Sequence, residues 1–456
     1  MKNGFVCVLA LLLAACTVQR FRPVPLAPGQ TAAKLESRTL QDDGLRQFVE
    51  TALGRPVTWP PRDYDLRFLT LAAFYFNPDL ALARAQLETA RAGIQTARMR
   101  PNPVLDISPG IPSPYLMGVG LAFPIITAGK RNYEIRYANN ISAQAEFSLA
   151  ELAWRIRSQV RSALLNYLLD ERNAALAQDA EQLQETRIRR ATEQLELGEI
   201  SRPEVETTRA AFLDAQMAAR AAEGRLAPDR ATLAASIGIP PRALEGAQLV
   251  WYNLEDVPSL SALTKNEVRR DAVLNRLDVR RALADYQAAQ SNLQLEIARQ
   301  IPNLQLGPGY QYEERQSYFT TSVSIELPIL NHNQGPIAQA EAQRKQAAAN
   351  LMATQANVLA QCEQAFAQYR TDDEVLQAAQ AVRINFQRVQ MPTADRALQA
   401  GESDWFSLNS VQLQSSAADK TWIDSVFQTQ AAIGQLEDAI QKPLETEDST
   451  PMVLPK

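Results

Sequence analysis

Residues Phe319 to Gly335, with the sequence FTTSVSIELPILNHNQG, decide the fold. From Phe319 to Leu327 the odd-numbered side chains share one face of a strand, and the even-numbered ones, all polar, share the other. This alternation predicts a strand with one face towards an apolar phase and one towards water. Pro328 ends the strand because proline has no N–H to donate to the ladder. Beyond Gly335 the sequence becomes a long helix rich in Ala, Gln and Glu, so the stretch is a strand-to-helix joint.

A second joint of the same kind lies in the first half of the chain. Alternation over 115–123 predicts a strand that Pro124 ends, and Gly129-Lys130-Arg131 then leads into a helix. Each strand has a predicted hairpin partner just before it, over 104–108 in the first half and 304–312 in the second. The chain therefore supplies four short strands.

The longest uninterrupted helical pattern covers 132–197. At about 1.5 Å per residue, about 65 residues extend about 98 Å, which exceeds the width of a compact domain. Such a helix needs lateral partners along its length, as in a coiled-coil-like bundle. Gly198 ends it, and Ser201 with Pro203 starts a return helix. Residues 132–236 are therefore predicted to form a helical hairpin.

The same order of elements recurs about 200 residues later in the chain. Asp79 corresponds to Asp278, Pro101 to Pro302, Pro124 to Pro328, and Gly198 to Gly401. We therefore predict a mainly α protein with a small β part, built from a duplicated helix–strand–strand–long helix–helix repeat. The predicted divisions are a signal peptide (1–15), a lipidated extended arm (16–61), a first repeat (62–241) with strands over 104–108 and 115–123 and a hairpin over 132–236, a linker (242–261), a second repeat (262–441) with strands over 304–312 and 319–327 and a hairpin over 336–440, and a disordered tail (442–456).

The first sixteen residues have the pattern of a targeting segment. Lys2 supplies a positive charge, and residues 5–13 form an apolar run too short to span a bilayer. The run closes with Leu13-Ala14-Ala15-Cys16, which resembles the bacterial lipobox, in which the cysteine becomes the lipid-modified first residue. The alternative is an ordinary signal peptide with a chance cysteine. By analogy with lipoproteins, Thr17 favours delivery to the outer membrane.

Charge and composition argue against several function classes. A net charge of -5, a pI near 5.4 and the lack of a Lys/Arg stripe give no reason to expect a nucleic acid partner. The single histidine, His332, rules out most His-based metal sites and catalytic triads, and no cysteine spacing fits zinc. Cys362, the one cysteine left after processing, is best explained as a small buried hydrophobe. We therefore expect no enzyme activity, no cofactor and no metal site.

The four predicted strands constrain how copies of the chain can assemble. Strands of about nine residues can cross a bilayer when tilted, and alternation of apolar with polar or small residues is typical of outer-membrane β-barrels. Four strands cannot close a barrel, and open edges are not tolerated in lipid, so other copies must complete it. A dimer would give eight strands filled by side chains, whereas the twelve strands of a trimer can leave a channel. The alternative is a soluble rod in which both hairpins pack on helices.

The sequence resembles the TolC-like outer membrane efflux proteins of the lipoprotein group over about 71–440. The strongest pieces are Phe123-Pro-Ile-Ile-Thr-Ala-Gly-Lys-Arg131 and Leu327-Pro-Ile-Leu-Asn-His-Asn-Gln-Gly335, which look most like the CzcC-like branch that serves heavy-metal pumps of the RND type. The resemblance implies a homotrimer whose twelve-stranded β-barrel continues as a twelve-helix α-barrel. The implied location is the outer membrane of a Gram-negative bacterium, with a lipid anchor and a large periplasmic part. The implied partners are further copies of the chain, outer-membrane lipid, a periplasmic adaptor (membrane fusion) protein and an inner-membrane RND-type pump.

The resemblance also assigns roles to the two hairpin tips. In this family each tip carries a glycine and meets the adaptor, and Leu197-Gly198-Glu199 and Ala400-Gly401-Glu402 match that pattern. Family members often narrow the duct just inside the tips with rings of acidic residues. The candidate constriction residues are Glu204, which matches that place in the first half, Ser407 and Ser410, which hold the corresponding places in the second, and nearby Asp404. A carboxylate repeated around a narrow pore would attract cations.

The expected function is a passive outer-membrane duct for the substrate of an inner-membrane pump, with heavy-metal cations as the cargo that the branch resemblance implies. One alternative is the outer-membrane component of a drug efflux or type I secretion system. Another is a periplasmic adaptor lipoprotein, against which the duplicated hairpins and the four bilayer-length strands argue. An enzyme is the third, and the sequence shows no nucleophile motif for it.

Overall fold

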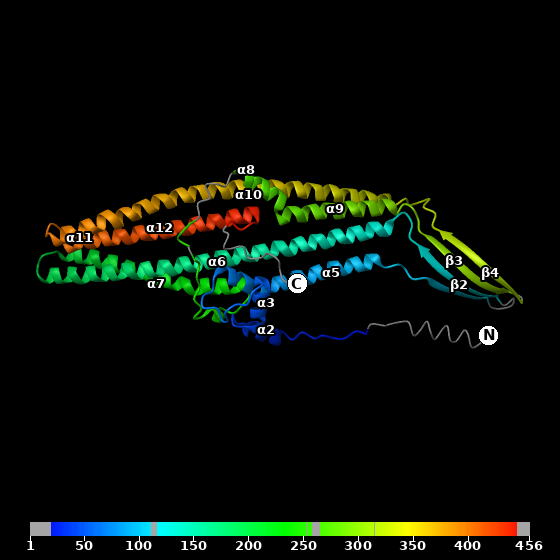
Figure 1. The fold of residues 1–456 in the computed structure, drawn as a ribbon, viewed down its shortest axis with the longest axis horizontal. Helices are drawn as coiled ribbons and strands as arrows, with labels where there is room; N and C mark the ends of the chain where they lie inside the picture. Colours follow the sequence, from blue (N-terminus) through cyan, green and yellow to red (C-terminus); the bar gives the residue numbers. More distant parts are fainter. Residues whose placement is uncertain (1–19, 111–115, 253, 258–264, 314, 445–456) are drawn as a thin grey trace.

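The computed structural model describes residues 20–110, 116–252, 254–257, 265–313 and 315–444. The molecule is long and narrow, with a small sheet at one end and the turns of the helical hairpins at the other (Figure 1). Most of the described chain is α-helical and the small sheet is antiparallel, which confirms the prediction of a mainly α protein with a small β part. The signal peptide, Cys16 and most of the predicted tail lie outside the described residues.

The sheet has the strand order β1-β2-β3-β4 with antiparallel neighbours throughout. The strands are β1 (Val104–Gly110), β2 (Leu116–Ile125), β3 (Leu304–Glu313) and β4 (Gln316–Ile325). The prediction of 319–327 for the last strand was therefore displaced towards the C-terminus. Gln316 already pairs with Glu313, and the ladder ends where Ile325 pairs with Leu304, the first residue of β3.

Three prolines lie within the described strands: Pro109 in β1, where it pairs with Met117, Pro124 in β2 and Pro308 in β3. The predicted strand over 304–312 contained Pro308, but Pro109 lay outside the predicted 104–108 strand and Pro124 was expected to end its strand. Pro124 pairs with Gln305 inside β2 instead of ending it. β1 begins at Val104, opposite Ala122, so no residue of β1 lies opposite Pro124. At Pro124 β2 therefore has a partner strand on one side only, where proline is tolerated. Pro308 lies inside β3, where the β2–β3 pairing is interrupted between Gly120 and Phe123.

The long helices run from the sheet to the far turns. In the first half α6 (Lys130–Glu196, 67 residues) is followed by α7 (Arg202–Ile237). In the second half α10 (Gln334–Asn385) continues through a π-helical turn (Phe386–Gln390) into α11 (Met391–Gln399), and α12 (Trp405–Ile440) returns. The hairpin predicted over 336–440 did not anticipate this π-helical turn. Pro392 has no N–H to donate, and a wider turn absorbs the missing bond. None of the helices in the described part of the chain combines the length and apolarity needed to cross a bilayer.

Shorter helices stack end to end beside the long ones. α5 (Pro78–Arg98) continues the line of α7, and α9 (Leu277–Ala298) continues that of α12 (Figure 1). At the first junction the Asn77 side-chain amide donates to the Ser236 carbonyl at 3.2 Å. At the second, Arg276 donates to the Ala439 carbonyl at 3.2 Å, and the Gln441 side chain accepts from the Leu277 N–H at 2.6 Å. Each junction thus satisfies backbone groups that a helix end leaves without intrahelical partners.

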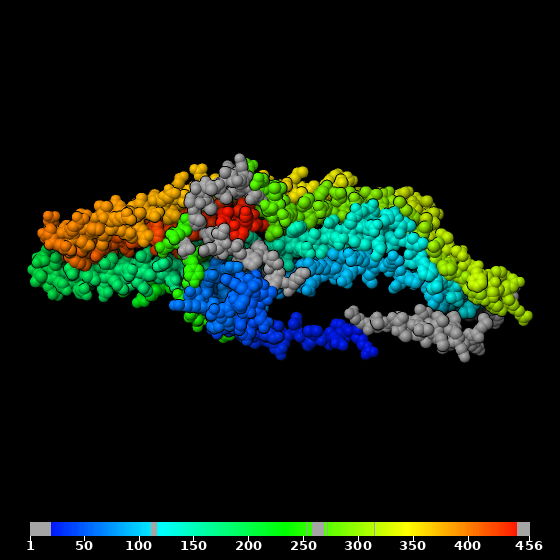
Figure 2. Space-filling view, viewed as in Figure 1, coloured from blue at the N-terminus to red at the C-terminus, as the bar shows by residue number. Residues whose placement is uncertain are grey.

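A compact unit covers the middle of the rod. Its helices are α2 (Pro28–Glu36), α3 (Asp43–Leu53) and α4 (Leu66–Phe76), with a short 3-10 turn at Pro241–Leu244. A further helix, α8 (Lys265–Asn275), packs separately against α9, α10 and α12. Figure 2 shows α2 to α4 as a blue bulge on the helical surface. The main hydrophobic core lies here, with Leu45, Leu69, Phe74, Ile156, Leu164 and Ile237 almost fully buried. Residues 20–27 are extended and exposed as predicted for the arm, but α2 was not predicted and buries no side chain.

Candidate functional site

One face of the sheet is apolar across all four strands. The register aligns Ile107, Val119, Tyr310 and Phe319 in one row, and Leu105 with Leu121 in the next. The other large side chains of this face are Met117, Phe123, Ile125, Leu304, Leu306, Tyr312, Val323 and Ile325. Many of them are exposed, with Phe319 at 91%. An exposed apolar face of this extent marks a surface for contact with lipid or protein.

The opposite face carries small and polar residues. One row across the sheet reads Asp106, Gly120, Gly309 and Thr320. A Cβ atom at Gly307 would lie 2.2 Å from Ser322 Oγ, and one at Gly309 would lie 2.7 Å from Thr320 Oγ1. The glycines therefore make room for hydroxyl groups, and the sheet separates a polar surface from an apolar one.

The two outer strands leave the sheet open on both sides. Within the described residues β1 pairs only with β2, and β4 pairs only with β3. The helical layer has the same order, since α5 and α7 lie beside α6, while α10 packs against α9 and α12 at the other side. Both layers therefore end in matching free edges, formed by α5, α7 and β1 on one side and by α10 and β4 on the other.

The predicted docking tips lie together at the end of the rod that is furthest from the sheet (Figure 1). Gly198 and Gly401 adopt left-handed conformations, with φ of 76° and 72°. Backbone bonds from Glu199 to the Gln194 carbonyl and from Glu402 to the Ala397 carbonyl close both helix ends in the same way. Leu197 is exposed at 74%. The two tips thus share one backbone geometry and present exposed side chains.

The acidic constriction candidates act as helix caps in this structure. The Glu204 carboxylate accepts from the Ser201 N–H at 3.0 Å and completes a capping box. Asp404 is the N-cap of α12 and accepts from the Ser407 N–H at 2.8 Å. Hydrogen bonds from the Ser407 side chain and backbone hold the pKa of Asp404 below its usual value. Both carboxylates lie just inside the tips and are exposed, as the constriction hypothesis requires.

The sequence analysis missed two arginines that join the hairpins near the tips. Arg187 of α6 donates to Asn409 Oδ1 at 3.2 Å and to Ser410 Oγ at 2.9 Å on α12. Arg190 lies 4.2 Å from the centroid of the Trp405 ring. Ser410 is therefore part of an inter-hairpin contact. The one signal in the sequence was the aromatic pair Trp405-Phe406 directly after the tip.

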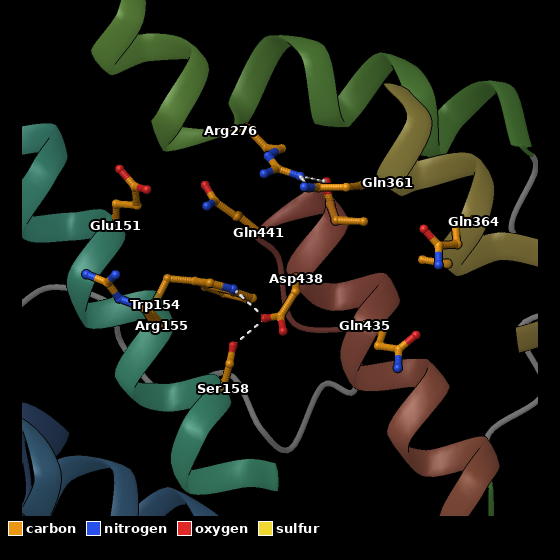
Figure 3. A pocket seen from close by; sticks show the side chains of 12 residues that line it. Glu151, Trp154, Arg155, Ser158, Arg276, Gln361, Gln364, Gln435, Asp438 and Gln441 are labelled. Atoms are coloured by element: carbon orange, nitrogen blue, oxygen red, sulfur yellow. Dashed lines mark hydrogen bonds between the residues drawn. The ribbon is translucent and has the colours of Figure 1, made fainter. Parts of the chain in front are cut away.

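A polar pocket lies between α6, α10 and α12 at the mid-level of the rod (Figure 3). Its volume is about 480 Å³. Asp438 accepts hydrogen bonds from Trp154 Nε1 at 2.7 Å and from the Ser158 hydroxyl, while Arg276 donates to Gln361 at 2.8 Å. Burial raises the pKa of Asp438. These side chains are engaged with one another, and the pocket has the character of a helix junction.

Directly beside this pocket lies a buried ion cluster. Glu437, exposed at 1%, lies 3.0 Å from Arg157 Nη1 and 3.6 Å from Arg161 Nε. It also accepts from the Leu444 N–H at 2.7 Å, while Arg161 donates to the Gln430 carbonyl at 2.8 Å. The cluster fastens α12 to α6. Among the described residues, no group of three His, Cys, Asp or Glu side chains is placed to hold a metal ion.

A carboxyl pair links α6 to α7 within the first hairpin. Asp229 Oδ2 is buried without a hydrogen-bond donor, and its neighbour is Asp170, which pairs with Arg225 at 3.3 Å. Burial, together with the hydrogen bond and charge of Asp170, raises the pKa of Asp229 to about 6. A proton shared by the two carboxyls would satisfy the buried oxygen.

We expect the stability of this hairpin to fall as pH rises through about 6. The folded state holds the Asp229 proton to higher pH than the unfolded chain does, so the contribution is present at low pH and lost above the folded pKa. D229N, whose amide can donate to Asp170 at any pH, should raise the melting temperature at pH 7.5 by about 1–2 °C and flatten its pH dependence. D214N, at an exposed position of the same helix, is the control. Equal pH profiles for wild type and D229N would contradict the shared proton.

Comparison with known proteins identifies the family. The model of the family described as "Outer membrane efflux protein" matches residues 75–239 and 268–440, which is most of the chain. The chain belongs to the outer membrane efflux protein family. This membership confirms the resemblance drawn from the two joints.

The relatives of this efflux protein include a metal-resistance protein. The cobalt-zinc-cadmium resistance protein CzcC of Cupriavidus metallidurans is 26% identical over 291 residues, covering 62% of this chain and 68% of the relative. Among solved structures, CusC has a TM-score of 0.66 at 18% identity, with 85% of this chain and 94% of CusC covered. The outer-membrane channel OprN has a TM-score of 0.67 at 16% identity, with 93% and 99% covered. The structural likenesses establish the fold.

Proposed function

We propose that this efflux protein is a passive homotrimeric duct across the outer membrane, the outer component of a tripartite efflux system. The observation that carries the proposal is the four-stranded sheet, apolar on one face, polar on the other and open at both edges. A sheet in lipid must close on itself, because unpaired backbone groups there cost several kcal/mol each, on the order of the desolvation of a peptide group.

Three copies supply the closure that one copy lacks. Twelve strands make a barrel wide enough for a channel, whereas eight leave an interior filled by side chains. The apolar face would meet lipid and the glycine-rich polar face would line water. The matching edges of the helical layer would continue the ring as a twelve-helix barrel, in which the two halves of each chain act as structural repeats. In this proposal Cys16 carries the lipid anchor on the periplasmic side.

The hairpin tips are the proposed contact with a periplasmic adaptor, which connects the duct to an inner-membrane RND-type pump. Their support is the shared geometry at Gly198 and Gly401 and the exposed Leu197. Glu204 and Asp404 lie just inside the tips, where carboxylates repeated three times would favour cations. Heavy-metal cations are the proposed cargo because a relative is named for cobalt, zinc and cadmium resistance. The duct itself needs no resident metal and performs no reaction.

Conductance and native mass test the proposal together. The purified protein should have the native mass of a trimer in detergent and should form cation-selective pores in planar bilayers. Neutralising the candidates with E204Q and D404N should reduce the preference for cations without abolishing conductance. A non-conducting monomer would contradict the duct, and a conducting dimer would contradict the twelve-stranded barrel.

A further inference from the structure

The first strand-to-helix joint docks on a specific loop of the same chain. The Thr127 hydroxyl donates to the Pro302 carbonyl at 2.6 Å, and the Thr127 N–H donates to Asn303 Oδ1 at 3.3 Å. Lys130 Nζ donates to Asn303 Oδ1 at 2.7 Å and to the Ile301 carbonyl. Lys130 is exposed at 6%. The joint between β2 and α6 is thereby fixed to the loop between α9 and β3, its neighbour around the molecule.

The second joint has the same backbone. Gly129 and Asn333 are both left-handed N-caps, with φ of 69° and 61°, and each lies five residues after the proline of its joint, Pro124 or Pro328. This alignment places Asn331 at the position of Thr127 and Gln334 at that of Lys130. Both replacements keep a side chain that can donate a hydrogen bond.

The donors of the second joint point to a partner outside the described chain. Asn331 Oδ1 accepts from the Asn333 N–H at 2.8 Å, and Gln334 Oε1 accepts from the His332 N–H at 2.8 Å. The carbonyl ends of both amides are thus used locally, which leaves their NH₂ groups to donate. Asn331 and Gln334 are exposed, in contrast to the buried Lys130. Their joint leads into α10, which forms a free edge of the molecule.

The matching loop lies at the opposite edge. Pro101-Asn102-Pro103, between α5 and β1, occupies the place in the first half that Pro302-Asn303 occupies in the second. All three of its residues are exposed. Arg98 and Arg100 flank it, so a neutral glutamine is a better donor here than a lysine, which would add a third cation.

We propose that Asn331 and Gln334 of each copy bind the loop at Asn102 of the neighbouring copy, as Thr127 and Lys130 bind the loop at Asn303 within the chain. The inference rests on the proposed trimer and names the contact that closes it. Asn331 donates to the carbonyl of Pro101, and Gln334 donates to the side-chain oxygen of Asn102. Repeated three times, the contact locks the base of the barrel to the helices at the point where copies meet.

Cysteine pairs test this contact. Oxidised N102C/N331C should run mainly as covalent dimer and trimer on a denaturing gel without reductant, since a disulfide forms only when the two Cα atoms lie within about 7 Å. T127C/N303C is the matched control and should cross-link within the chain, with loss of free thiols and no change of mass. The single variants N102C and N331C should stay monomeric on the gel. Cys362 is exposed at 1% and should not interfere.

The native mass of each variant distinguishes failure of the proposed contact from failure of the proposed trimer. A trimeric N102C/N331C protein that forms no bond between copies, while T127C/N303C cross-links, would overturn the contact and leave the duct intact. A monomeric wild type would overturn both proposals. A test without introduced cysteines measures the temperature at which the trimer dissociates. N331A/Q334A should lower this temperature. N139A, a substitution at an exposed position of α6, should leave it unchanged. Equal dissociation temperatures for the two variants would also contradict the contact.

Discussion

T321R should strongly reduce the amount of this efflux protein in the outer membrane. Thr321 lies near the middle of β4, in register with Pro308, on the apolar face that is proposed to meet lipid. An arginine at the mid-plane of a barrel costs about 2–4 kcal/mol on the lipid side, and a trimer carries it three times. We expect little trimer in the outer-membrane fraction and a lower urea midpoint for protein refolded in lipid vesicles.

T320R is the matched control, with the same substitution one residue earlier. Thr320 faces the polar side, opposite Gly309, so an arginine there would extend into water. Its membrane level should stay close to wild type, while its pore should lose part of its preference for cations. If T320R reduced the membrane level as much as T321R, the assignment of the two faces would be wrong.

E437L should be the most destabilising single change among the helices. It removes the carboxylate against which two nearly buried guanidiniums pack, those of Arg157 and Arg161, and also the acceptor of the Leu444 N–H. Removal of one partner from a buried ion cluster typically costs about 3–5 kcal/mol, because the remaining charge stays away from water. The midpoint of urea unfolding, followed by circular dichroism, should fall accordingly.

An exposed ion pair between α5 and α6 is the control. Arg91 and Glu146 lie 2.8 Å apart with side chains exposed at 58% and 51%. E146L should therefore change stability by less than about 1 kcal/mol. R157M/E437L should recover part of the loss, because one buried charge leaves with its partner. Equal effects of E437L and E146L would show that the cluster does not hold α12 to α6.

Local chemistry made much of this architecture predictable. The alternation over Phe319–Leu327 specified the two faces of β4, although the strand lies slightly earlier in the chain. Gly198 and Gly401 marked the tips because a left-handed helix end favours glycine. The two joints, read as sequence, were sufficient to indicate the family. Each of these signals depends on the backbone within a few residues, which is why it can be recognised from the sequence alone.

Contacts between helices could not be read in the same way. Arg187 meets Ser410, Arg157 meets Glu437 and Asp170 meets Asp229 across 59 to 280 positions of the chain. Such pairings depend on the rotation and the axial register of neighbouring helices, since a shift of one residue turns a side chain by about 100°. The roles of Glu204 and Asp404 as caps also emerged only with the hairpin turns in place.

The joint at Phe319–Gly335 shows both what the sequence determines and what the tertiary structure adds. The sequence by itself determined that a strand ends at this point and a long helix begins, because alternation, a proline and a helical period are local properties. Only the tertiary structure decided that the joint lies at a free edge and presents unused amide donors, while its counterpart at Lys130 is buried against Asn303. That difference arises from the order of strands and helices around the molecule, which brings distant segments together and leaves one joint at a free edge.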